Sequence, residues 1–160
     1  MPFDSFLKVA TVPGESTDDK HPEWIEVLSY TWASSHAQSA TEEGGGQRVE
    51  ISDFSVVKQL DKASPRLFLL CATGETIADA TLEICKAAGE KQKFMTYKMS
   101  GVLVVSVKPG GSGKSGDALP LEEISFRFSK IELEYIPIDK MGKPQPPVLA
   151  GWDVAKNTKI

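Results

Sequence analysis

The second half of the chain alternates apolar and polar residues with a period of two, the pattern of a β-strand with one buried face. One apolar series runs from Met95 to Val107, and Gly101 interrupts it as a predicted bend or bulge. A second series at 124–128 shifts phase before it resumes at 131–135. An extra residue near Ser129 explains the shift, so we expect the strand to leave one sheet there and enter another.

Weaker patterns in the first half predict further strands. Residues 3–12 and 80–86 each carry a short apolar series, and residues 48–60 repeat the phase shift, with Val49 and Ile51 on one parity and Phe54 and Val56 on the other. A last strand at 148–155 follows a proline-rich stretch, which is typical of an extended connection that returns to a sheet edge.

Only one segment predicts a helix. Ser64 is placed to cap its N-terminus, Pro65 suits the first helical position, and Gly74 marks its end after about nine residues. We therefore expect a mainly β fold over a single domain, residues 1–160. The expected architecture is a small β-barrel or two-sheet β-sandwich with one short flanking α-helix.

Composition favours a folded protein without a nucleic-acid or membrane partner. Of the 160 residues, 41% are hydrophobic and 25% are charged, and the net charge of −4 comes without a basic stripe for phosphates. The start of the chain lacks a signal-peptide pattern, and no run of 18 apolar residues predicts a membrane span. We expect synthesis in the cytoplasm and, if the protein is exported, a route that reads no signal peptide.

Candidate chemistry is weak, and we expect no enzyme activity, metal or cofactor. The segment 109–115 ends like a phosphate-binding loop, but Lys108 stands where that loop needs a glycine, and a strand follows in place of a helix. His21 and His36 fall in polar segments without a partner at catalytic or metal-ligand spacing. Cys71 and Cys85 are interpreted as small buried hydrophobic residues.

The strand at 24–33 instead indicates surplus apolar surface. Its two faces both carry apolar side chains, and the chain has three tryptophans and seven phenylalanines. One face holds Trp24, Leu28, Tyr30 and Trp32, and the other holds Ile25, Val27, Ser29, Thr31 and Ala33. A single small core cannot bury all of this apolar surface, so we expect part of it to form a protein interface.

Short motifs along nearly the whole chain resemble the haemolysin-coregulated protein (Hcp) family, the tube subunits of bacterial type VI secretion. Their order and spacing carry the resemblance more than any single motif. They are Gly14-Glu15-Ser16, His21 before Ile25, Val27-Leu28-Ser29 with Trp32, Asp61-Lys62, Ser64-Pro65, Lys86-Ala87-Ala88-Gly89-Glu90, Gly110-Gly111-Ser112-Gly113, Phe128 with Ile131 and Tyr135, and Gly151-Trp152-Asp153.

The resemblance implies a fold like that of a phage tail tube and a homohexameric ring with a wide lumen. Rings of this family stack into a tube inside a contractile sheath, beneath a spike protein, and are secreted when the sheath contracts, with small effector proteins held in the lumen. Some relatives carry a toxin domain after the tube module, whereas this chain ends at Ile160, so we expect the plain subunit. A phage-type tail-tube protein is the first alternative, and a small hydrolase using a loop serine is a weaker one.

Two sets of residues are assigned to this assembly. Small polar side chains suit a water-filled lumen, so the predicted effector-facing wall is Ser29, Thr31 and Ser35. The loop at 34–48 is too long and too polar for a hairpin turn and is predicted to contact the next ring. The turn at 86–91 is a second candidate. The predicted stacking residues are Gln38, Ser39, Glu42, Glu43, Gly44, Gly45, Gly46, Gln47, Gly89, Glu90 and Lys91.

Overall fold

The computed structural model describes residues 2–36, 48–113 and 119–160, which form strands and one helix. In chain order the elements are β1 Phe3–Val9, β2 Ile25–Val27, β3 Ser29–Thr31, β4 Ser34–His36, β5 Val49–Ile51, β6 Phe54–Gln59, α1 Ser64–Thr73, β7 Ile77–Lys86, β8 Lys93–Gly110, β9 Leu121–Arg127, β10 Lys130–Tyr135, β11 Val148–Asp153 and β12 Thr158–Lys159. The mainly β class with a single short helix is thus confirmed.

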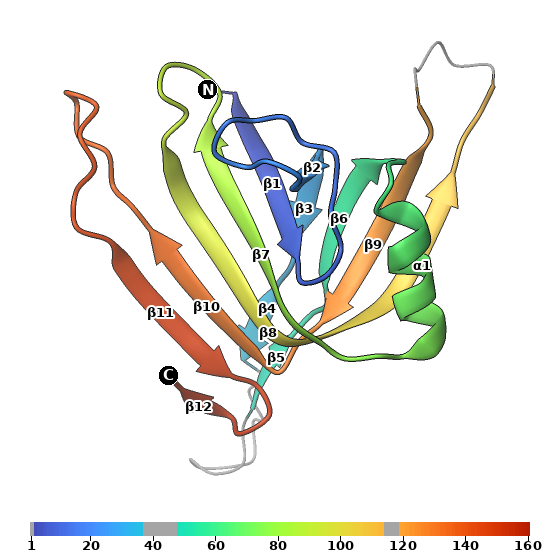
Figure 1. Cartoon of the computed structure of the whole chain (residues 1–160). Helices are drawn as coiled ribbons and strands as arrows, with labels where there is room; N and C mark the ends of the chain where they lie inside the picture. The colour runs from blue at the N-terminus through green and yellow to red at the C-terminus, as the bar shows by residue number, and fades with distance from the viewer. Residues whose placement is uncertain (1, 37–47, 114–118) are drawn as a thin grey trace.

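The strands form two sheets that share the long strand β8 (Figure 1). The larger sheet has the order β12-β11-β10-β8-β7-β1-β2, and the smaller runs β8-β9-β6-β3, with all pairs antiparallel. The first half of β8 pairs with β7 and β10, and its second half pairs with β9. The hairpin β4-β5 forms a separate two-stranded ladder.

Gly101 is the point at which β8 passes from one sheet to the other. Its φ of +60° is a conformation that favours glycine, and the N–H of Ser129 donates to the carbonyls of Ser100 and Gly101. Ser129 separates β9, in the smaller sheet, from β10, in the larger one. Both sequence signals, the glycine and the phase shift, therefore mark one corner of the fold, as predicted.

The core lies between the two sheets, and the helix covers one side of it. From the larger sheet come Leu7, Leu82 and Met99, and from the smaller come Phe54 and Phe126, all fully buried. Leu67 and Leu70 of α1 join the same cluster. In Figure 1 the helix lies in front of the smaller sheet, at the side of the molecule away from β10 and β11.

The predicted β-barrel is wrong, because the sheets are open. Within the described residues, the ladders end at β12 and β2 in the larger sheet and at β3 in the smaller, and no ladder joins these ends. The chain bends at Leu28 between β2 and β3, which pair with β1 and β6 respectively. A two-sheet sandwich opened on one side is the better description.

Local predictions failed at three places. The strand at 24–33 breaks at Leu28, so Ile25 and Val27 enter the core while Leu28 is exposed. Residues 34–36, predicted as loop, pair with β5 as a strand. The predicted cap, Ser64, is already helical and Ala63 is the N-cap; the Ser64 hydroxyl accepts the N–H of Asp61 and donates to Glu122. Gly74 ends the helix in a left-handed conformation, as predicted.

Candidate functional surfaces

An apolar face on β10 and β11 extends beyond the core. Cross-strand pairing continues the buried rows of the larger sheet onto these two strands, where the side chains become more exposed. In one such row the exposed fraction rises from 7% at Val27 and 3% at Ile84 to 48% at Tyr135 and 63% at Val148. We call this the β10-β11 apolar face, formed by Leu133, Tyr135, Val148, Ala150 and Trp152.

The lower part of this face is hollowed. The hairpin β4-β5 lies opposite it and leaves a cavity of about 250 Å³, lined by Trp32, Ser34, Val49, Ile51, Ile131, Leu133, Ala150, Gly151 and Trp152. Aromatic rings close the inner end, where Trp32 and Tyr97 meet edge to face with centroids 5.7 Å apart. The result is an apolar groove open to solvent, of the kind that usually receives another protein surface.

A second apolar patch lies on the helix. Phe68 and Leu69 of α1 point away from the core and are each about 60% exposed. In Figure 1 the helix and the strands β10 and β11 occupy opposite sides of the molecule. Two different apolar patches on opposite sides suit a head-to-tail contact between copies, because such a contact joins unlike surfaces.

One row of small polar side chains crosses the outer face of the smaller sheet. Thr31 on β3 is paired with Ser55 on β6, Ser55 with Ser125 on β9, and Ser125 with Ser106 on β8. The hydroxyl oxygens of Ser55 and Ser125 lie 2.9 Å apart, within hydrogen-bond distance. This row of hydroxyl groups, named here the hydroxyl row, crosses all four strands. Such a surface is wettable and nearly flat.

The structure brings together two of the three predicted lumen residues. Ser29 and Thr31 are exposed on β3 and belong to the same outer face, with Ser29 paired to Val57. Ser35 is also exposed but lies on β4, opposite Glu50 in the separate hairpin. The sequence placed Leu28 on the opposite face of one continuous strand from Ser29 and Thr31. That prediction is wrong, because the strand is interrupted by a bend at Leu28.

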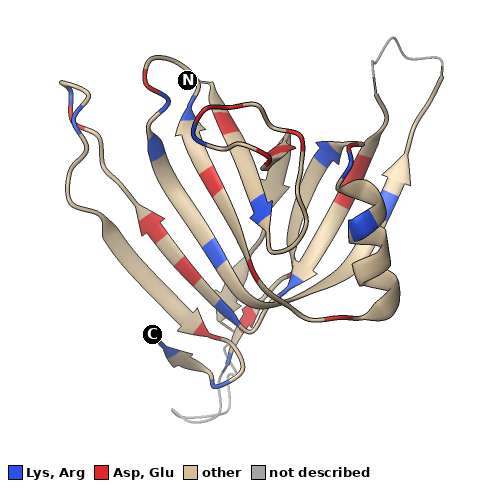
Figure 2. Cartoon of the chain, in the orientation of Figure 1, with Lys and Arg blue, Asp and Glu red and all other residues tan. Residues whose placement is uncertain are grey.

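Charged residues concentrate on the outer face of the larger sheet. Figure 2 shows acidic bands on β10 beside a basic band on β8, and pairing sets Glu132 opposite Lys98. Leu149 of β11 points to this charged side, since it follows Val148 along a strand and is itself 68% exposed. The two faces of β11 therefore differ: one is apolar, and the other borders a charged surface.

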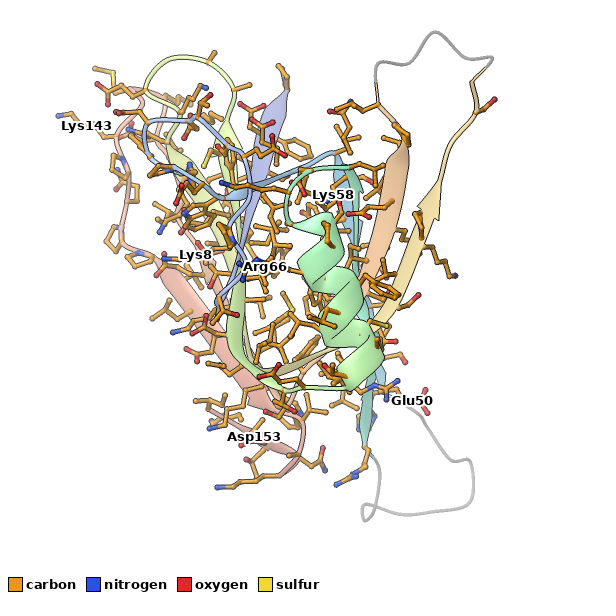
Figure 3. The ribbon with its side chains drawn as sticks, turned by 45° about the vertical axis from the view of Figure 1, so that its right-hand side comes forward. Lys8, Glu50, Lys58, Arg66, Lys143 and Asp153 are labelled. Atoms are coloured by element: carbon orange, nitrogen blue, oxygen red, sulfur yellow. The ribbon has the colours of Figure 1, made fainter. Side chains whose placement is uncertain are left out.

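One buried lysine ties the helix to the smaller sheet. The Lys58 ammonium is fully buried, 2.5 Å from a Glu122 oxygen and 2.9 Å from an Asp61 oxygen. Figure 3 shows Lys58 beside the first turn of α1, where the Ser64 hydroxyl also contacts it at 3.3 Å. Sequence patterns did not reveal this network, because its main contact joins residues 64 positions apart.

The described residues bear on two kinds of reactive site, a nucleophilic thiol and a metal centre. Burial raises the pKa of the Cys85 thiol to about 11, which makes it a poor nucleophile. In the described parts of the chain, no group of three or more His, Cys, Asp or Glu side chains is arranged to hold a metal ion. No described helix is long and apolar enough to cross a membrane.

Comparison with known proteins identifies the family. Residues 6–135 match the model of the family described as "Type VI secretion system effector, Hcp". The chain is 36% identical to the protein hcp1 of Pseudomonas aeruginosa, over 99% of both chains. This chain belongs to the Hcp family. The family consists of structural proteins of type VI secretion and is not a family of enzymes.

Solved Hcp structures share the fold. The crystal structure of Hcp1 from Salmonella typhimurium superposes with a TM-score of 0.83 at 34% identity, covering all of both chains. A structure titled as a type six secretion system protein gives a TM-score of 0.91, also at 34% identity, over 99% of this chain and all of that one. A type VI secretion system effector from Yersinia pestis gives 0.75 at 31% identity, over 94% of this chain and all of that one.

The stacking residues predicted from the Hcp resemblance fall in two places. Those from Gln38 to Gln47 lie outside the described residues. Gly89, Glu90 and Lys91 form part of the turn between β7 and β8, where Gly89 and Glu90 are exposed. This turn is tied to the loop before β2: the Lys20 ammonium donates to the Glu90 carbonyl at 2.8 Å, and Lys91 contacts Asp18 at 3.2 Å.

Proposed function

We propose that this Hcp protein is the ring-forming tube subunit of a type VI secretion system. The observation that carries the proposal is the β10-β11 apolar face. It continues the apolar rows of the core onto two strands whose side chains the subunit itself leaves exposed. Tyr135 and Val148 are each about half exposed or more, although their rows are buried elsewhere in the sheet. A neighbouring copy that covers this face completes the core.

The contact between copies is heterologous. The side of the molecule that carries α1 presents Phe68 and Leu69, and the opposite side presents the β10-β11 apolar face (Figure 1). Two strand edges support the same geometry: β3 pairs only with β6, and β8 beyond Val102 pairs only with β9, among the described residues. Unpaired edges accept a strand of a neighbour, and a repeated head-to-tail contact closes into a ring.

The remaining parts of the proposal come from the family. Hexameric rings stack into a tube inside the contractile sheath, meet the spike protein at one end and are secreted when the sheath contracts. The 36% identity to a Pseudomonas Hcp1 along the whole chain favours this function over that of a phage-type tail-tube protein.

We propose the outer face of the smaller sheet as the wall of the lumen. The hydroxyl row and the exposed side chains of Ser29 and Thr31 give it small, hydrated side chains. Ser35 stays a prediction on the neighbouring hairpin. Replacing Thr31 with Tyr adds bulk on this wall and should leave rings intact while abolishing co-purification of a small effector protein. Unchanged effector binding by intact Thr31→Tyr rings contradicts the assignment.

Ring-to-ring contact is assigned to the 38–47 segment and, second, to the turn that holds Gly89, Glu90 and Lys91. The turn connects the antiparallel strands β7 and β8 and therefore lies at an end of the larger sheet. Deletion of residues 38–47 should spare the folded subunit and reduce tube length in electron micrographs. Tubes of unchanged length contradict the first assignment.

Two neighbouring residues on β11 test the ring itself. Val148 and Leu149 are similarly exposed, at 63% and 68%, but they point to opposite faces. Val148→Asp places a charge on the apolar face and should convert rings into monomers, as measured by light scattering after gel filtration. Leu149→Asp is the matched control and should leave rings intact. Rings that survive Val148→Asp and dissociate in Leu149→Asp contradict the proposed interface.

A further inference from the structure

His21 is buried under the loop that precedes β2. It is 2% exposed, and its ring stacks on Phe6 of β1 with centroids 4.2 Å apart and planes 7° apart. The indole of Trp24 meets the imidazole edge to face at 4.7 Å. His21 is therefore one of the contacts that hold the loop of residues 10–24 on the outer face of the larger sheet.

Both imidazole nitrogens meet carboxylates. Nδ1 lies 2.7 Å from Asp18 in the same loop, and Nε2 lies 2.8 Å from Glu83 on β7. A neutral imidazole has a single N–H, whereas both contacts need a donor facing an ionised carboxylate. The arrangement is therefore satisfied when His21 is an imidazolium and Asp18 and Glu83 are ionised. The Cys85 thiol, 3.8 Å from Nε2, adds an uncharged contact from β7.

These carboxylates also bind lysines from neighbouring elements. Lys91, in the turn, contacts Asp18 at 3.2 Å, and Lys93 of β8 contacts Glu83 at 3.6 Å and Glu134 of β10 at 3.8 Å. β1 contributes the uncharged ring of Phe6, and its Asp4 is paired with Cys85. With His21 protonated, three cations (His21, Lys91 and Lys93) contact the carboxylates of Asp18, Glu83 and Glu134.

We propose that His21 is a pH-dependent latch that fixes the loop 10–24 and the turn 87–92 as one surface. Loss of one imidazole proton leaves a carboxylate facing a lone pair on a buried ring and removes one of the three cations that contact the carboxylates. An unpaired charge of this kind is costly when buried. The loop can relieve the cost by lifting His21 into solvent, which also breaks the Lys91 contact to Asp18.

Acid opens the latch from the other side. The hydrogen bond from His21 holds the pKa of Asp18 below its ordinary value, with Lys91 and the backbone N–H of Lys20 contributing. Asp18 therefore stays ionised, and keeps its contact with His21, to a lower pH than an ordinary aspartate would. The latch is closed over a pH window bounded below by carboxylate protonation and above by imidazole deprotonation.

The latch also bears on assembly, and this part rests on the proposed function. The turn it holds contains Gly89, Glu90 and Lys91, the second candidate for ring-to-ring contact. Opening of the latch frees this turn from Lys20 and Asp18, so we expect stacking to weaken as His21 loses its proton. The buried latch and the exposed stacking surface can be measured separately.

The test follows His21 and the loop in the same full-length sample. Histidine C2-proton exchange by mass spectrometry reports the ionisation of His21, and backbone amide exchange reports the loop, whose amides at Gly14, Ser16 and Glu23 are hydrogen-bonded to loop carbonyls. We expect amide protection at 13–24 to fall about tenfold or more over the pH range in which His21 deprotonates. His21→Gln should abolish this pH step.

The controls separate the latch from other pH effects. His36→Gln, at the exposed histidine of β4, should leave the step unchanged. Lys91→Met removes one cation and should move the step. Loop protection that stays constant while His21 titrates in the wild-type protein overturns the latch, even if His21→Gln fails to fold. A step in loop protection with constant tube length overturns only its link to stacking.

Discussion

Replacement of Lys58 by Met tests how the helix is held on the smaller sheet. The ammonium of Lys58 is fully buried and contacts Glu122 and Asp61, whose side chains are 2% and 13% exposed. Met keeps most of the aliphatic stem but leaves the Glu122 carboxylate buried with the Ser64 hydroxyl as its remaining contact. Breaking such a pair costs about 3–5 kcal/mol. For a domain of this size the melting temperature should fall by roughly 10 °C.

A double variant identifies the cause of that loss. Lys58→Met combined with Glu122→Leu removes both buried charges, and replacing a buried pair by apolar side chains is often close to neutral. The double variant should therefore be clearly more stable than Lys58→Met alone in urea unfolding followed by circular dichroism. If the double variant is as unstable as the single one, the unpaired Glu122 charge is not the cause.

An exposed ion pair provides the control. The ammonium of Lys62 lies 3.9 Å from Glu23, and both side chains are at least half exposed. Lys62→Met should cost under about 0.5 kcal/mol, because exposed pairs contribute little. A loss at Lys62 as large as that at Lys58 refutes the role assigned to burial.

Three further predictions concern the corner, the latch and the thiols. Gly101→Ala should lose about 1–2 kcal/mol from its positive φ alone, and more because the added Cβ lies 2.3 Å from the Ser129 hydroxyl oxygen; wild-type stability in Gly101→Ala refutes this. Asp18→Asn removes a carboxylate with a lowered pKa, so the wild-type advantage should be present above about pH 4 and lost as the pH falls further; a gap independent of pH contradicts it. Iodoacetamide near pH 8 should label Cys71 and spare Cys85, whose pKa is raised; prompt labelling of native Cys85 counts against its burial.

Period-two patterns predicted those parts of the fold that depend on local alternation. The phase shift near Ser129 indicated a strand that changes sheets, and Gly101 indicated a bend or bulge; the structure places both at one corner. Whether the sheets close into a barrel could not be predicted. Closure depends on whether the edge strands of the two sheets pair with each other, and local alternation does not report that pairing. Nothing in the pattern around Leu28 indicates the bend that separates β2 from β3.

Buried polar contacts were also beyond the sequence. Lysine is rarely buried, so Lys58 is not distinguishable from an exposed strand residue until Glu122 is placed beside it. His21 was assigned to a polar loop, because its partner Glu83 lies 62 positions away. In contrast, the exposure of Ser29 and Thr31 follows from small polar residues alternating on a strand, and the structure leaves both exposed.

The mass of the purified protein in solution, measured over increasing concentration together with negative-stain electron microscopy, tests the central claim most directly. The proposed function predicts a closed hexameric ring with a central lumen. A protein that remains monomeric at high concentration, with no rings in the micrographs, contradicts the account.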